Sequence, residues 1–169
     1  IHETKHTVFY ESSNERPVEH NRNSIVQRFL KSDCDVLLQI DADVVPRLNP
    51  LNLADCNVDI ISAPCWLYQG RVYLNVYRFD KTDDSLVPVT GKHLAEIDAT
   101  GSGVIMISRN VLETLKAPFE RKYDENGIEL LGQDLYFCEK ARDAGFKIYT
   151  NFDYVAKHYK TVDLGEFAQ

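Results

Sequence analysis

Two aspartates one residue apart, Asp41 and Asp43, directly follow an apolar run at residues 36–40 in the stretch VLLQIDADVVP. An apolar run of this length indicates a buried strand, and open α/β sheets bind their ligands at the carboxyl ends of strands. Carboxylates at such a strand end are suited to hold a hard divalent cation, Mn²⁺ or Mg²⁺. We therefore predict a metal site at Asp41 and Asp43, with a simple Asp turn as the alternative.

A second Asp-x-Asp pattern, Asp33-Cys34-Asp35, lies before the apolar run. Aspartate favours turns and helix caps, so this copy is interpreted as part of a solvated loop. The two copies have the same spacing, and only their positions relative to the strand distinguish them.

The elements predicted before and after the aspartates alternate between strand and helix. A short strand is expected at residues 8–10, a helix capped by Asn23 or Ser24, the strand at 36–40, and another apolar strand at 58–63. Residues 66–79 then alternate between apolar and polar side chains, and Gln69-Gly70 is predicted to turn a hairpin.

The last part of the chain continues this mixture. A Gly-containing loop near residues 100–103 runs into an apolar strand, a short helix is expected at 110–115, and residues 120–132 are interpreted as a loop. A helix is predicted at 133–144 with Gly145 as its C-terminal cap, followed by strands near 146–149 and 154–158. The fold class predicted is α/β, with a mixed, mostly parallel sheet flanked by helices and antiparallel additions, in a single domain at residues 1–169.

Composition narrows the function classes. The chain has 169 residues and a net charge of −7, which argues against a nonspecific nucleic-acid-binding protein. Its four cysteines show no zinc-binding spacing and are expected to be free thiols in a reducing compartment. No segment has the length of apolar sequence that crosses a membrane, so we predict a cytoplasmic protein.

Four motifs occur in order along the chain: HNRNSIVQRFL, VLLQIDADVVP, ATGSGVIMISRNVLETL, and GQDLYFCEKARDAGFKIYTN with YVAKH behind it. This order resembles the nucleotide-sugar glycosyltransferases of the GT-A fold, especially the family-2-like and bacteriophage-type members, and the resemblance implies a Rossmann-like sheet. Those enzymes usually open with an additional strand and helix, for which there is no room before Val8. The domain is therefore expected to be incomplete at its N-terminus.

The resemblance implies roles for the acidic residues and one histidine. Asp43 would be the direct metal ligand, and Asp41 would reach the ribose of the donor or a metal-bound water. His158 would close the metal site or touch the diphosphate, and a neutral imidazole suits that role. His20 is its nearest rival among the other histidines, and an ordinary structural histidine is the alternative. Asp134 would be the general base that deprotonates the acceptor, although aspartate is also favoured in any first helical turn.

The same resemblance implies donor contacts for two residues of the first helix region, and the residue types themselves suggest the contacts of the others. Arg22 and Asn23 would bind the donor, with helix capping as the alternative for Asn23. Thr100, Gly101, Ser102 and Gly103 would let the backbone approach the sugar closely, with a plain strand-entry turn as the alternative. Trp66 and Tyr68 would stack on a sugar or base, although aromatic side chains more often belong to a core.

Together these features predict a metal-dependent glycosyltransferase that moves a sugar from a nucleotide-diphosphate sugar to a carbohydrate or other hydroxyl acceptor, with inversion if Asp134 is the base. A noncatalytic carbohydrate- or nucleotide-binding module is an alternative. A nucleotidyltransferase is another, but it would normally carry a Gly-rich, basic N-terminal loop that this chain does not have. The oligomeric state stays open, because a sheet edge without its first strand would invite a partner strand.

Overall fold

The computed structural model describes residues 6–83 and 85–160 of the chain. Its α-helices are α1 (Val18–Leu30), α2 (Arg109–Thr114) and α3 (Gln133–Asp143), and two short 3-10 helices are η1 (Pro50–Cys56) and η2 (Phe152–Tyr154). The strands are β1 (Val36–Ile40), β2 (Val44–Val45), β3 (Ile60–Ser62), β4 (Trp66–Tyr68), β5 (Val72–Leu74), β6 (Val76–Asp80), β7 (Ser85–Pro88), β8 (Leu94–Ile97), β9 (Ala99–Thr100), β10 (Val104–Ser108), β11 (Lys122–Tyr123), β12 (Glu129–Leu131), β13 (Ile148–Asn151) and β14 (Lys157–His158).

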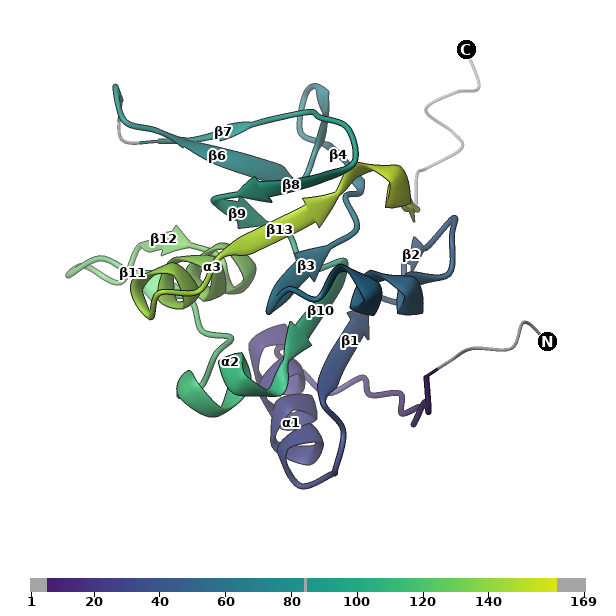
Figure 1. The fold of residues 1–169 in the computed structure, drawn as a ribbon. Helices are drawn as coiled ribbons and strands as arrows, with labels where there is room; N and C mark the ends of the chain where they lie inside the picture. Colours follow the sequence, from purple (N-terminus) through teal and green to yellow (C-terminus); the bar gives the residue numbers. More distant parts are fainter. Residues whose placement is uncertain (1–5, 84, 161–169) are drawn as a thin grey trace, which may run out of the picture.

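Five strands form the central sheet, in the order β1-β10-β3-β13-β8 (Figure 1). Within the described residues, only β3 and β13 pair in parallel, and the other paired strands run antiparallel. The remaining strands make small sheets of two or three. The prediction of a mostly parallel, helix-flanked, Rossmann-like sheet is therefore wrong.

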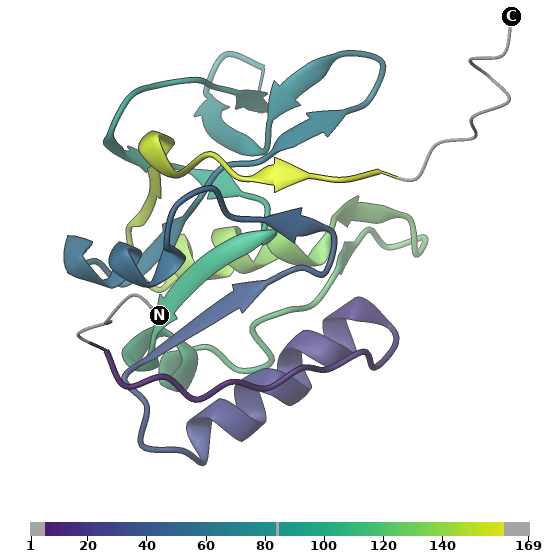
Figure 2. The same ribbon diagram turned by 90° about the vertical axis from the view of Figure 1, so that its right-hand side faces the viewer.

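The apolar stretch of β10 explains this error. Ile105 and Ile107 face a core that includes residues of all three α-helices, whereas Val104 and Met106 face a second core with Leu53 of η1. Burial on both faces produces the continuous apolar run that is typical of parallel strands, although β10 runs antiparallel to both neighbours. Figure 2 shows α1 and η1 on opposite sides of the central sheet.

Strand β1 lies at one edge of this sheet. Val36 and Ile40 are 41% and 43% exposed, so the apolar run before the aspartates is not the fully buried strand that we predicted. Its hydrogen bonds run to β10 alone, from Val36↔Ser108 to Ile40↔Val104. The strand nevertheless ends directly before Asp41, as the sequence indicated.

Local turn and helix signals were more successful. The hairpin at Gln69-Gly70 is confirmed, with β4 and β5 antiparallel and Gly70 at a φ of +71°. Helices α2 and α3 lie close to their predicted ranges, and Gly145 follows α3 at a φ of +89°. These features depend on residues close together in the sequence.

Three local predictions were wrong. Helix α1 begins at Val18 and not near residue 24, because Pro17 occupies the N-cap position and does not interrupt the helix. Residues 120–132 contain the β11–β12 hairpin where a loop was expected. Residues 8–10 form no strand and are exposed, with Phe9 and Tyr10 at 80% and 89%.

No helix within the described ranges is both long enough and apolar enough to span a membrane.

Candidate functional site

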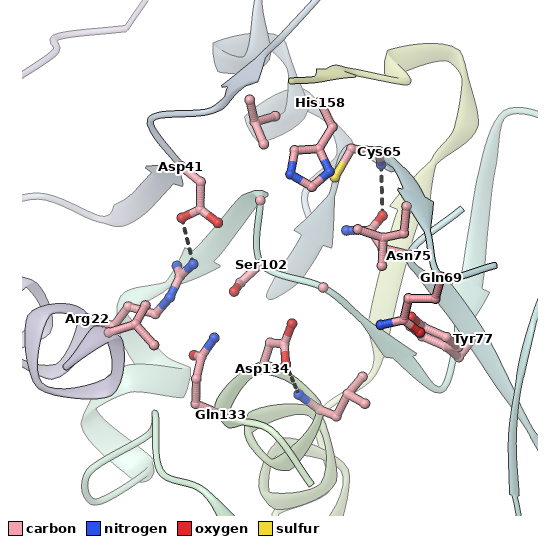
Figure 3. Close-up of a pocket in the computed structure, with 16 residues that line it drawn as sticks. Arg22, Asp41, Cys65, Gln69, Asn75, Tyr77, Ser102, Gln133, Asp134 and His158 are labelled. Atoms are coloured by element: carbon pink, nitrogen blue, oxygen red, sulfur yellow. Dashed lines mark hydrogen bonds and ion pairs between the residues drawn. The ribbon is translucent and has the colours of Figure 1, made fainter. Parts of the chain in front are cut away.

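A cleft of about 330 Å³ opens beyond the end of β1 (Figure 3). Several segments far apart in the sequence contribute to it: α1, the end of β1, the β4–β5 hairpin, the loop between β9 and β10, the start of α3, and β14. Most of the predicted site residues line this one cleft. They are Arg22, Asp41, Gly101, Ser102, Gly103, Asp134 and His158.

Asp41 is held by main-chain and side-chain contacts. Its backbone N–H donates to the carbonyl of Gly103 (2.9 Å), which fixes the end of β1 against the glycine loop. Its Oδ1 accepts from Nη2 of Arg22 at 2.6 Å. Arg22 is buried on α1 and also donates to Oε1 of Gln39 (2.9 Å), so its guanidinium is oriented by Gln39 of β1 and by Asp41 directly after it. The charged partner of Arg22 within the protein is therefore Asp41.

The electrostatic environment of Asp41 is crowded with carboxylates. Partial burial raises the pKa of Asp41 above its ordinary value, and the positive charge of Arg22 opposes this effect. The negative charges of Asp43 and Asp134 raise the pKa further. Arg22 pairs with Asp41 alone, and a bound cation would reduce the repulsion between Asp41 and the other two carboxylates.

Asp43 and His158 meet through the pairing of β2 with β14. His158 is the register partner of Val44, and the N–H of Tyr159 donates to the carbonyl of Asp43 (2.8 Å). This places Nε2 of His158 3.1 Å from Oδ2 of Asp43. The His158 side chain is only 10% exposed, whereas that of Asp43 is 53% exposed and reaches solvent.

The partners of His158 decide where its protons lie. Nδ1 is 2.9 Å from the backbone carbonyl of Trp66, and a carbonyl only accepts hydrogen bonds, so Nδ1 carries a proton. In the neutral imidazole, Nε2 then presents a lone pair toward the Asp43 carboxylate, which also only accepts. Two acceptors at this distance require a proton or a cation between them. A metal-binding histidine commonly donates its other N–H to a backbone carbonyl in this way.

These two side chains fit a divalent metal in part. Within residues 6–83 and 85–160, no group of three or more His, Cys, Asp or Glu side chains is arranged to hold a metal ion. Asp41, the third predicted ligand, is paired with Arg22. A Mg²⁺ or Mn²⁺ ion in an enzyme is, however, often held by one or two protein ligands together with substrate phosphates and water. Asp43 and His158 suit that incomplete coordination.

The start of α3 forms the opposite wall of the cleft. Asp134 lies in the first turn, and its side chain points into the cleft (Figure 3). Gln133 beside it is buried and also lines the cleft. Its Oε1 is buried and has no hydrogen-bond partner in the described part of the chain. A buried acceptor without a partner is costly, so a polar ligand there would be favoured.

Three predicted site residues do not line this cleft: Asp43, Asn23 and Trp66. Asp43 contacts His158, which does line it. Asn23 makes two hydrogen bonds to the backbone of Phe119 (2.6 and 3.1 Å) and does not cap α1, whose N-cap is Pro17. Trp66 is 44% exposed and contributes only its carbonyl, to His158. His20, the rival to His158, is exposed and pairs with Glu15 at 3.3 Å. Asn23 lies next to Arg22 on a helix and therefore faces a different direction.

The glycine loop serves the packing of the protein itself. A Cβ at Gly101 would meet Nδ2 of Asn75 at 2.5 Å, and one at Gly103 would meet Sγ of Cys65 at 3.0 Å. Asn75 cannot move freely, because its Oδ1 accepts from the N–H of Cys65 (2.8 Å). The close approach that requires glycine is therefore to Asn75 and Cys65, which flank the β4–β5 hairpin.

The sequence analysis did not predict that residues of the β4–β5 hairpin and the residue before it line the cleft. Cys65, Leu67 and Gln69 line the cleft, whereas Trp66 and Tyr68 do not. Alternate residues of a strand point to opposite faces, so this division has the period of two that a strand imposes. This alternation could be read from the sequence. With Leu67 placed in the cleft, it would have placed Trp66 on the opposite face.

Cys65 is a poor nucleophile in this setting. Burial, followed by the negative charges of Asp41 and Asp43, raises the pKa of its thiol to about 12. The thiol therefore stays protonated at neutral pH.

Comparisons with known proteins bear on the fold. No protein-family model matches this chain, and no curated protein sequence matches it. A solved structure described as the crystal structure of A197 from STIV superposes with a TM-score of 0.63 at 22% sequence identity, over 89% of this chain and 71% of that one. At this identity the likeness concerns the fold alone.

Proposed function

We propose that this chain is a metal-dependent glycosyltransferase that transfers a sugar from a nucleotide-diphosphate sugar to a hydroxyl acceptor, with inversion. The ordered motifs supply the hypothesis, and the cleft supplies the chemistry. Its wall beyond β1 carries Asp41, Arg22 and His158, and its opposite wall carries Asp134. Asp43 lies beside His158, with Oδ2 3.1 Å from Nε2. Transfer of a glycosyl group requires both a site for the departing diphosphate and a base for the acceptor.

The observation that carries the proposal is the orientation of His158. Its Nδ1 is committed to the carbonyl of Trp66, and its Nε2 is directed at Asp43. A divalent ion bound there would neutralise the charge that develops on a departing diphosphate. His20 and His93 also lie beside carboxylates, but only His158 of these three lines the cleft.

The other residues have roles that follow from their contacts. Arg22 holds the Asp41 carboxylate in one position through the 2.6 Å ion pair, so that the remaining oxygen faces the cleft. Asp134 is the proposed base, since a cleft-facing carboxylate can take the proton of an acceptor hydroxyl within hydrogen-bond reach. Gln133 Oε1 is available to accept from a sugar hydroxyl.

The same proposal includes a cytoplasmic location. All four cysteines are free, and Cys65 and Cys138 are buried. Free thiols fit a reducing compartment.

Nucleotide binding provides the first test. We would titrate UDP and GDP into the protein with and without Mn²⁺ by calorimetry, and compare the wild type with Asp43→Asn. The matched control is Asp33→Asn, which changes the other Asp-x-Asp motif in an exposed loop. We expect Mn²⁺-dependent binding in the wild type and in the control, and its loss in Asp43→Asn. Binding that does not depend on Mn²⁺ would contradict the metal role.

Turnover provides the second test and concerns Asp134. We expect Asp134→Asn to keep nucleotide binding and to lower the rate of sugar transfer about 10²- to 10⁴-fold, the usual contribution of a general base. The assay would follow nucleotide release from UDP- and GDP-sugars with saccharide acceptors. Metal-dependent binding without turnover of any donor would favour the noncatalytic binding module instead.

A further inference from the structure

A second cleft, of about 480 Å³, adjoins the first. Gln69, Tyr77 and Leu135 line both clefts, so the two share a wall. The second cleft continues over Arg71 and Tyr73 of the β4–β5 hairpin, and over Leu86 and Pro88 of β7. Its volume lies in the usual range of small-ligand sites.

The lining of the second cleft differs in chemistry from that of the first. It holds no carboxylate, and it offers two tyrosine rings, one arginine, one glutamine and three apolar side chains. The rings of Tyr73 and Tyr77 lie edge to face with centroids 6.4 Å apart, and the Arg71 guanidinium lies 5.9 Å from the Tyr73 centroid. The cleft therefore offers no carboxylate to a metal ion, whereas its aromatic rings and polar groups suit a ring compound with an apolar face and polar edges.

Polar groups are available at the boundary between the clefts. The hydroxyl of Tyr73 donates to Oε1 of Gln69 (2.6 Å), which fixes that amide and leaves its Nε2 to donate elsewhere. Figure 3 shows Gln69 and Tyr77 together at the side of the first cleft away from Arg22 and Asp41. An oriented donor beside aromatic rings is a common feature of sites that bind polar ring compounds.

The position of Asp134 connects the two clefts. It lines the first cleft, and the next residue, Leu135, lines both. An acceptor whose hydroxyl reaches Asp134 must extend away from the metal side, and the second cleft is the space on that path.

We propose that the second cleft binds a saccharide acceptor, with one sugar ring against Tyr73 and Tyr77 and its hydroxyl groups in contact with Gln69 and Arg71. The acceptor role rests on the proposed function, whereas saccharide binding by this cleft is testable without it. A saccharide fits this cleft because the lining combines aromatic rings with hydrogen-bond donors at their edges and contains no carboxylate.

The test uses cellobiose, chitobiose, lactose and maltose as probes. Each is titrated into ¹⁵N-labelled protein, and backbone amide shifts are followed by NMR. We expect shifts concentrated at residues 69–77 and 85–88 for at least one disaccharide. Tyr73→Ala should weaken that binding about tenfold, equivalent to about 1.4 kcal/mol. Arg71→Ala, a second variant at an exposed hairpin position, should also weaken it.

The matched control is Tyr68→Ala, which removes a tyrosine from the same hairpin on the face that does not line either cleft. It should leave disaccharide affinity unchanged. The proposal is overturned if no disaccharide shifts the amides of the second cleft, or if Tyr68→Ala weakens binding as much as Tyr73→Ala does.

Failure of the proposed function would give a different result. UDP titration with Mn²⁺ into the wild type reports on the first cleft alone. Absence of that binding together with specific disaccharide shifts would reject the transferase and leave the saccharide site in place. Nucleotide binding without disaccharide shifts would reject the saccharide site alone.

Discussion

The two Asp-x-Asp motifs of this chain have the same spacing and very different surroundings. Asp33 and Asp35 are exposed between α1 and β1, and neither side chain makes a hydrogen bond or ion pair within the described residues. Asp41 is paired with buried Arg22, and Asp43 faces His158. The Asp-x-Asp spacing alone therefore does not determine whether the two carboxylates can bind a metal. Its neighbours, which come from distant parts of the chain, turn one copy into a candidate metal site.

The largest effect should come from exchanging one carboxylate in each motif. We expect Asp43→Asn to reduce UDP affinity in the presence of Mn²⁺ by at least about 100-fold, because even partners of metal ligands contribute up to that factor. Asp33→Asn should leave the affinity unchanged. Calorimetry measures both, and equal losses in the two variants would mean that net charge, and not the site, controls binding.

The next effect concerns the stability that Arg22 contributes. Arg22→Leu should lower the free energy of unfolding by about 2 kcal/mol, because it leaves Asp41 and the buried Gln39 without their partner. Arg28→Leu, on the same helix, should cost less than about 1 kcal/mol because its ion pairs with Glu11 and Glu15 are more exposed. Urea unfolding of both variants checks the difference. Similar midpoints would contradict a special role for Arg22.

A smaller effect should distinguish the pair His158–Asp43 from another histidine–carboxylate pair, His93–Asp153. His158→Ala should weaken Mn²⁺-dependent UDP binding about tenfold, since Nε2 would no longer be available beside Asp43. His93 also lies close to a carboxylate, 2.9 Å from Asp153, but its side chain is 80% exposed and lines neither cleft. His93→Ala should therefore bind UDP like the wild type. A loss in His93→Ala equal to that in His158→Ala would refute the assignment.

The smallest effect is a pH dependence of stability in metal-free protein. Because the pKa of Asp41 is raised, mainly by burial, the native state holds this proton to higher pH than the unfolded chain does. Its contribution is thus present below the ordinary pKa of 3.8 and is lost as the pH rises through the raised value. Asp41→Asn should remove this decline, and Asp35→Asn should retain it. Urea unfolding across that pH interval, with chelator present, measures the two slopes.

Part of the site could be predicted from residues that are close in sequence. The apolar run before Asp41, the hairpin turn at Gly70, and α3 with Gly145 at its end all depend on local backbone preferences. These signals placed Asp41 at a strand end and Asp134 in a first helical turn. They did not reveal that β1 is an exposed edge strand, because an apolar run does not show whether a neighbouring strand covers each of its edges.

The sequence by itself determined the kinds of side chain and the local elements that carry them, since these follow from short-range propensity and periodicity. Only the tertiary structure decided that β1 pairs with β10 in antiparallel fashion, that Arg22 faces Asp41 and Asn23 does not face the cleft, and that His158 meets Asp43. Asp43 and His158 are 115 positions apart. Their contact depends on the pairing of β2 with β14, and strand partners are selected by packing across the whole domain, which no local pattern of residues encodes.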